Sequence, residues 1–175
     1  MASATYTLIS SQVLGSSAAS ITFSSIPSTY NDLKFMISAR GDSPSATGLI
    51  RMYLNNDSGT NYSFTYILGN SSAASSTRYS SITVNNSISF NEATSTTSTF
   101  GSSEIYIPNY NSTSSKPFFN INVTENNSSA ADSADIKAVA SLYSGTSGIS
   151  SITLLTASNN FVANSSFYLY GIKNS

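Results

Sequence analysis

The chain has 175 residues, contains neither cysteine nor histidine, and carries a charge on only 9% of its residues. Without cysteine and histidine it cannot form a disulfide, a thiol nucleophile, a Ser-His-Asp triad or a zinc site of the usual ligands. Seven basic and eight acidic residues give a net charge of -1 without any basic run, which argues against nucleic-acid binding.

Size and composition favour one folded domain over residues 1–175. No stretch approaches the roughly 18 apolar residues that a membrane span requires. The N-terminal segment has no charge before Asp32 and no signal-peptide pattern. We therefore expect a folded protein with a nearly neutral surface and no membrane partner.

Five short strands are predicted in the first half of the chain, because apolar and polar residues alternate there between turn signals. In the clearest of them, residues 32–40, one face is predicted to be core. Asn55 to Gly59 form a strong turn signal, so the strands on either side of it are predicted to form a hairpin. The five ranges are 5–13, 21–23, 32–40, 49–54 and 62–68, and the core face of 32–40 consists of Leu33, Phe35, Ile37 and Ala39.

Residues 69–99 are mostly Ser, Thr, Ala and Asn. We predict a long, partly ordered excursion from the domain, with weak strand signals at 80–84 and 87–90. Its composition does not indicate a function.

Residues 101–125 are predicted to form the pair of strands around which the chain is organised. Pro108 closes the first strand, and Pro117 fixes the start of the second because proline is tolerated at a strand's first residue or edge. Alternation predicts a core face in both strands and in the following strand at 136–143. The residues assigned to the core are Ile105, Ile107, Phe119, Ile121, Val123, Ile136, Ala138, Ala140 and Leu142, whereas Asn120 and Asn122 are assigned to the solvent side.

Further strands are predicted at 149–155 and 167–172, and no segment has sustained helical periodicity. About ten short strands with little or no helix indicate an all-β protein. We expect an antiparallel β-sandwich, jelly-roll-like in form.

Three motifs suggest chemistry, but each has a simpler explanation. Arg40-Gly41-Asp42 spells an adhesion tripeptide, yet glycine and aspartate also suit a turn. Residues 55–60 offer oxygen ligands for calcium, although a turn explains them as well. The candidate carboxylates are not arranged as a catalytic pair, so we expect no enzyme and no catalytic, cofactor-binding or metal-binding residue. These carboxylates are Glu92, Glu104, Glu125, Asp132 and Asp135.

Tyrosines provide the positive signal, since aromatic residues with few charges nearby are favoured in protein interfaces and in carbohydrate sites. A packed face or a subunit contact is the favoured interpretation, and sugar binding is the alternative. Six tyrosines fall opposite the predicted core: Tyr53, Tyr106, Tyr110, Tyr143, Tyr168 and Tyr170. The predicted subunit interface consists of Tyr106, Asn109, Tyr110 and Phe118.

Three segments carry a resemblance to a known group of proteins: TYTLISSQVLGSSAASITFSSIPSTYNDLKFMISAR, EIYIPNY and NFVANSSFYLYGI. With these, the chain resembles small β-sandwich virion proteins of tailed bacteriophages, of the marine and cyanobacterial phage type. The resemblance implies many copies on the surface of the phage particle, without cofactors.

Within that group, we expect a capsid decoration or cement protein. It would be a homotrimer that binds the outside of the major capsid lattice. The alternative is a receptor- or glycan-binding jelly-roll subunit of a tail fibre or tail tip, in contact with other tail proteins. A carbohydrate-active enzyme is a third hypothesis.

Overall fold

The computed structural model describes residues 5–70, 72–125, 127 and 135–173. These residues form twelve strands and no helix, which confirms the predicted all-β class. Across these ranges, no helix is long and apolar enough to span a membrane. The strands are β1 (Tyr6–Val13), β2 (Ser20–Phe23), β3 (Asp32–Ala39), β4 (Thr47–Leu54), β5 (Tyr62–Gly69), β6 (Ala74–Ile82), β7 (Asn85–Asn91), β8 (Gly101–Ile107), β9 (Lys116–Val123), β10 (Ile136–Tyr143), β11 (Ile152–Thr156) and β12 (Ser166–Ile172).

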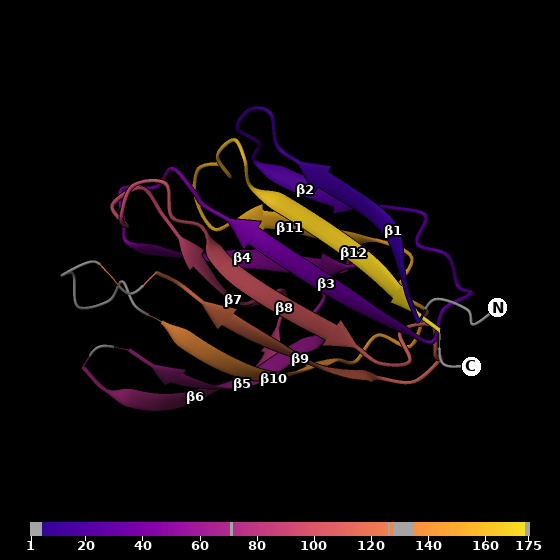
Figure 1. Cartoon of the computed structure of the whole chain (residues 1–175). Helices are drawn as coiled ribbons and strands as arrows, with labels where there is room; N and C mark the ends of the chain where they lie inside the picture. Colours follow the sequence, from indigo (N-terminus) through magenta and orange to yellow (C-terminus); the bar gives the residue numbers. More distant parts are fainter. Residues whose placement is uncertain (1–4, 71, 126, 128–134, 174–175) are drawn as a thin grey trace.

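Two antiparallel sheets of unequal size form the predicted β-sandwich (Figure 1). The large sheet has eight strands in the order β1-β12-β3-β8-β9-β10-β5-β6, and the small sheet has four in the order β2-β11-β4-β7. In the view of Figure 1 the large sheet lies in front of the small one. One face of the large sheet therefore looks away from the small sheet, and we call it the outer face.

One hydrophobic core lies between the sheets, and β3 contributes to it as predicted. Leu33, Phe35 and Ile37 of β3 are buried, and so are Ile50 and Met52 of β4. Aromatic rings interlock across this layer, which favours edge-to-face contacts. Two pairs are edge-to-face: Phe23 with Phe35, whose centroids lie 5.0 Å apart, and Phe161 with Phe167 at 5.1 Å.

The turn after β4 is where predicted, but the hairpin prediction is wrong. β4 belongs to the small sheet and β5 to the large sheet, so the turn carries the chain from one sheet to the other. Asn55 and Asn56 adopt positive φ, and Asp57 Oδ1 accepts a hydrogen bond from the Gly59 N–H at 2.7 Å. The turn residues determine where the chain reverses direction. The sheet that each strand joins depends instead on the strands with which it pairs.

Residues 69–99 are more regular than predicted, because they include the strands β6 and β7. β6 is an exposed edge strand, a position where a polar sequence is tolerated. β7 is almost entirely buried although most of its side chains are polar. Hydrogen bonds between these polar side chains and the large sheet, described below, explain why a sequence with little hydrophobicity forms a buried strand at the edge of the small sheet.

The orientation predicted for β9 and β10 is wrong. Phe119, Ile121 and Val123 are exposed on the outer face, whereas Asn120 and Asn122 are buried. In β10, the predicted core residues Ile136, Ala138, Ala140 and Leu142 likewise point outward. The pairing of β9 with β8 as neighbouring antiparallel strands, in contrast, is as predicted.

Three pairings among the described strands contain a register shift. They are β1 with β12, β4 with β7, and β5 with β6. In each pair, one strand is the edge strand of its sheet.

Candidate docking face

The outer face of the large sheet is unusually apolar for a surface open to solvent. Every exposed large hydrophobic side chain in the described part of the chain belongs to the large sheet. They are Tyr6, Leu8, Val13, Met36, Ile67, Tyr79, Phe119, Ile121, Val123, Ile136 and Leu142. All except Tyr79 point outward by their register, since Tyr79 pairs with the inward-facing Phe64.

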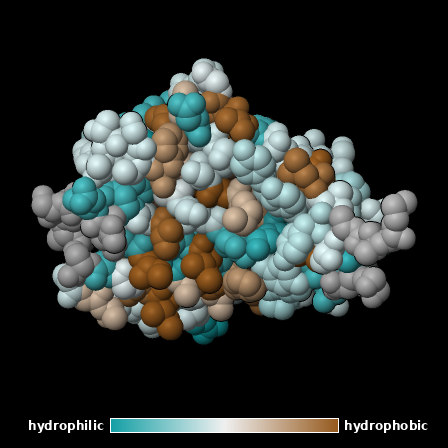
Figure 2. Space-filling view, in the orientation of Figure 1, coloured by the Kyte–Doolittle hydropathy of each residue, from teal (hydrophilic) through white to brown (hydrophobic). Residues whose placement is uncertain are grey.

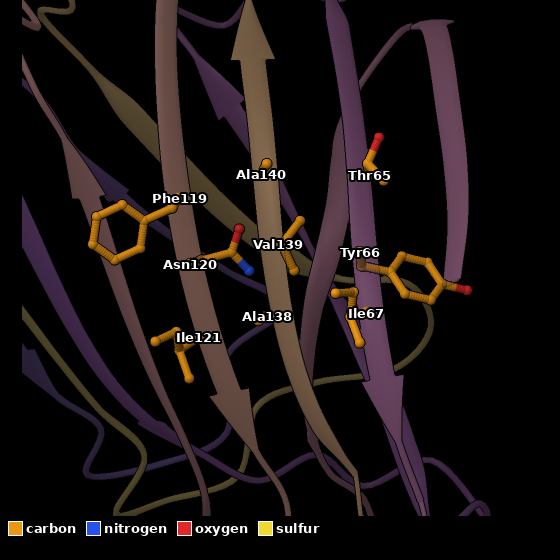
Figure 3. A pocket seen from close by; sticks show the side chains of 9 residues that line it. All are labelled: Thr65, Tyr66, Ile67, Phe119, Asn120, Ile121, Ala138, Val139 and Ala140. Carbon is orange, nitrogen blue, oxygen red and sulfur yellow. The ribbon is translucent and has the colours of Figure 1, made fainter. Parts of the chain in front are cut away.

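A groove runs along the outer face over β9, β10 and β5 (Figure 3). Ala138 pairs with Ile121 on one side and with Ile67 on the other. Ala140 lies likewise between Phe119 and Thr65. The two small alanines form the floor, and their larger neighbours form walls around a hollow of about 370 Å³. We call this hollow the apolar groove and define it by Thr65, Ile67, Phe119, Ile121, Ala138 and Ala140.

The exposed fractions of the walls are high for aliphatic and aromatic residues. Ile67 is 65% exposed, Ile121 48% and Phe119 44%. Figure 2 shows hydrophobic side chains gathered on this side of the molecule, over the lower part of the large sheet where β9 and β10 lie. The apolar groove therefore lies within a region where hydrophobic side chains gather on the surface.

Polar side chains lie on the other side of the same strands, between the two sheets. Lys137 Nζ donates to Ser89 Oγ at 2.7 Å, and Asn85 Nδ2 donates to Ser141 Oγ at 3.0 Å. Ser87 Oγ hydrogen-bonds Asn120 Oδ1 at 3.2 Å. We call this cluster the polar seam, and it consists of Asn85, Ser87, Ser89, Asn120, Asn122, Lys137 and Ser141.

Burial in the polar seam costs free energy. Burial lowers the pKa of Lys137, because the charged ammonium loses its hydration. The side-chain atoms Asn120 Nδ2 and Asn122 Oδ1 are buried and make no hydrogen bond to any of the residues that the structure describes. Unmet polar groups of this kind are unfavourable inside a fold.

The polar seam and the apolar groove lie on opposite sides of β9 and β10, so the orientation of these strands decides which set of side chains is buried. A shift of one residue would exchange the faces, burying the isoleucines and exposing the asparagines and Lys137. In the structure the isoleucines are exposed, and the asparagines and Lys137 are buried. β9 and β10 have this orientation in register with β8 and β5. Strands that turn apolar residues outward and polar residues inward are suited to a sheet whose outer face is covered in its working state.

A second, smaller hollow of about 280 Å³ lies over β1, β3 and β12, and Tyr6, Lys34, Met36 and Tyr170 line it. The Lys34 ammonium lies 5.6 Å from the centre of the Tyr6 ring and forms a salt bridge of 2.8 Å with Glu104. A site that combines aromatic rings with an ion pair can bind a polar ligand as well as a protein partner.

The four residues of the predicted interface do not form one surface. Tyr106 is half-buried on the outer face, where its ring lies 5.6 Å from that of Phe119, and Asn109 is exposed in the following turn. Tyr110 is 0% exposed and Phe118 is 4% exposed, so both belong to the core and the prediction is wrong for these two side chains. For Tyr106 and Asn109, interface membership stays a prediction.

Hydrogen bonds explain these placements. The Tyr106 hydroxyl donates to Asp32 Oδ2 at 2.6 Å, which raises the pKa of the tyrosine to about 12. The Asn109 N–H donates to Asp32 Oδ1 at 2.8 Å. The Tyr110 hydroxyl donates to the carbonyl of Pro27 and ties the turn to the core. Tyr143 was also expected outside, but it is buried and donates to Asp57 Oδ2 at 3.0 Å.

The adhesion tripeptide is used inside the fold. The Arg40 guanidinium donates to the carbonyl oxygens of four residues in the loop after β7, and Asp42 accepts hydrogen bonds from Asn160. Both charged groups are therefore held by the protein itself, in agreement with the turn interpretation. The four carbonyls belong to Ala93, Ser95, Thr96 and Thr99.

Three of the carboxylates considered for catalysis also have structural partners. Glu104 pairs with Lys34, and Glu125 accepts backbone hydrogen bonds from Thr96 and Asn127. Glu92 is 2% exposed and accepts from the Ser43 N–H at 3.0 Å. Asp132 lies outside the described residues. No group of three or more potential ligands within the described ranges is arranged to hold a metal ion.

Sequence reasoning missed the apolar groove, although its signal is visible in the residues. The alternation of β10 offers two faces, one with Ile, Ala, Ala and Leu and one with Lys, Val, Ser and Tyr. The first looks more like a core face. Only the complementary polar residues of β7 identify the second as the buried one.

Comparisons with protein-family models, curated proteins and solved structures give no match for this chain.

Proposed function

We propose that this protein is a structural subunit of a larger protein assembly and that it makes its contacts through the outer face of the large sheet. The observation that carries the proposal is the orientation of β9 and β10. These strands expose Phe119 and Ile121 while they bury Asn120 and Asn122. A partner that covers the outer face would recover the hydrophobic free energy of the exposed set, about 25 cal/mol per Å².

The specific role follows from the resemblance to small virion proteins of tailed phages. It is a capsid decoration or cement protein on the particle surface, in contact with the major capsid protein and without enzymatic activity. The low charge of the chain and its apolar outer face are compatible with such a role, which requires protein contacts and no catalysis. A homotrimer is the form expected for such a decoration protein.

Copy number in purified virions tests this role. Quantitative mass spectrometry should find hundreds of copies per particle if the protein decorates the head. A few dozen copies or fewer would overturn decoration, and absence from the particle would overturn the virion role altogether.

A matched pair of variants tests the outer face in the same particles. Ala138→Arg places a charge in the floor of the apolar groove, and Ser20→Arg places one at an exposed position of the small sheet. The proposal predicts that Ala138→Arg lowers incorporation at least tenfold while Ser20→Arg leaves it unchanged. Equal incorporation of both variants would exclude the outer face as the contact surface.

A tail-fibre or tail-tip subunit that binds glycans is the second candidate. The hollow between Tyr6 and Tyr170 favours it, because sugar rings stack on aromatic faces and Lys34 and Glu104 offer hydrogen bonds to hydroxyl groups. Binding to a glycan array that disappears in Tyr170→Ala would support this candidate. An array without any binding would count against it.

A further inference from the structure

We infer that the apolar groove binds the same groove of a second copy of this chain, and that the protein forms a twofold dimer with its large sheets face to face. This inference rests on the proposed function, because it names the occupant of the outer face. Three properties of the face support it: its area, its charge and its relief.

The exposed area fits one half of a dimer interface. Six large side chains over β5, β9 and β10 range from 36% to 65% exposed, and Ile67 and Ile136 are the most exposed of them. An aromatic side chain buries roughly 150 to 250 Å², and with this range as an upper guide for the mostly aliphatic set, the six contribute at most on the order of 600 Å². A stable interface buries about 800 Å² per partner, and the flanking alanines and tyrosines supply the remainder.

The charges on the outer face favour a partner that is itself neutral. The Lys34 ammonium and the Glu104 carboxylate neutralise each other at 2.8 Å within one copy. Arg78 is exposed on the edge strand β6, at the margin of the face. The centre therefore carries no net charge for a basic or acidic partner to match, and a second copy can cover it without burying an unpaired ion.

The relief of the face is complementary to itself. Phe119 and Ile121 stand as a ridge along β9, beside the floor made by Ala138 and Ala140 on β10 (Figure 3). A twofold axis through this region places the ridge of each copy in the groove of the other. Sheets packed in this way interdigitate their side chains across a layer about 10 Å thick.

The symmetry has a definite consequence for the number of copies. A surface that meets itself generates a closed twofold pair, whereas a trimer joins two different surfaces of each copy. The inference therefore predicts a dimer in place of the homotrimer expected for a decoration protein. The dimer would then be the unit that is incorporated into the particle, so that Ala138→Arg lowers incorporation by preventing the dimer from forming.

Sedimentation equilibrium of the purified full-length chain tests the inference. Between about 1 and 200 µM protein, the range in which a patch of this size is expected to associate, the mass should reach twice the 18.4 kDa of one chain. Ala138→Arg should weaken the dimer at least tenfold, and Ser20→Arg should leave it unchanged. Circular dichroism checks that each variant is folded, and Ile67→Lys replaces Ala138→Arg if the latter does not fold.

Several outcomes would overturn the inference: a monomer over the whole range, a trimer, or a dimer that tolerates both groove variants. Comparison with virions separates this failure from failure of the proposed function. A monomeric protein whose Ala138→Arg variant is not incorporated into particles would keep the docking role and reject the second copy. A groove-dependent dimer that is absent from particles would keep the inference and reject the virion role.

Discussion

The carboxylate of Glu92 is buried and packs closely against two glycines. A Cβ atom at Gly41 would lie 2.1 Å from its Oε2, and one at Gly48 would lie 2.1 Å from its Oε1. A side chain at either position would displace this carboxylate, so both positions favour glycine for space and not for backbone conformation. Burial raises the pKa of Glu92 from its ordinary value of 4.5 to about 7.

This raised pKa makes stability depend on pH in a definite direction. Because the folded state binds the proton more tightly than the unfolded state, the stabilisation is complete below pH 4.5 and is lost as the pH rises to about 7. We expect the free energy of unfolding to fall by about 2 to 3 kcal/mol over this range. Glu92→Gln should abolish most of that fall, as measured by urea denaturation at several pH values.

Asp57 provides the control. Hydrogen bonds from Asn61 and Gly59 lower the pKa of Asp57 below 3.8, so its contribution to stability is lost only at more acidic pH. Asp57→Asn should therefore leave the slope between pH 4.5 and 7 unchanged. An unaltered slope in Glu92→Gln would show that another group titrates there.

At the scale of single elements, β9 and β10 are held in place by their neighbours and by the polar seam. Lys137 reaches Ser89 across the interior, and Asn85 reaches Ser141. Val139 and Phe118 add buried apolar contacts on the same side. The inner side of these strands therefore combines polar and apolar packing, and their outer side is available for a partner.

A pair of threonine substitutions tests this orientation. Val139 is 3% exposed, so Val139→Thr buries a hydroxyl and should destabilise the monomer by about 1 to 2 kcal/mol. Ile121→Thr acts on a side chain that is half exposed and should cost less than about 1 kcal/mol. Urea denaturation at concentrations where the protein is monomeric measures both. The reverse order of effects would mean that the faces are exchanged.

The sequence predicted the fold class and most of the strands, because alternation and turn residues are local signals. It predicted the core face of β3 correctly, since Leu33, Phe35 and Ile37 have no competing apolar set. For β10 both alternate sets contain apolar residues, so local pattern could not decide between them. The deciding contacts come from β7, about 50 residues away in the chain.

The candidate site was less predictable than the fold. The tyrosine signal identified the outer face at Tyr106, Tyr168 and Tyr170, which are half-buried there. It also selected Tyr110 and Tyr143, whose hydroxyl groups are satisfied inside the protein by Pro27 and Asp57. A tyrosine with a buried hydrogen-bond partner cannot be distinguished from a surface tyrosine by its spacing.

At the scale of the whole molecule, the two outer surfaces are unlike each other. The small sheet presents Ser20 and Thr22 as exposed residues, with Thr153 half-buried beside them. The large sheet presents the apolar groove. Association through one face only would leave the more polar sheet on the outside of any pair.

Association through the apolar groove should be insensitive to salt. The ion pair of the outer face lies within one copy, so screening removes no attraction between copies. We expect the dimer Kd to change less than about threefold between 50 mM and 1 M NaCl, because apolar burial persists at high salt. Sedimentation at the two salt concentrations measures this, and a tenfold weakening would indicate charges that bind across the interface.

The register shifts at the margins of the sheets bear on solubility. An open edge strand can recruit strands from other molecules and begin fibril growth, and a bulge hinders such recruitment by interrupting the ladder of hydrogen-bonding groups. Three of the four edge strands, β1, β6 and β7, pair irregularly with their neighbours, and the fourth, β2, has only four residues. The chain has few charges that would repel its copies from one another. The irregular or short edge strands therefore hinder the addition of further strands from other copies.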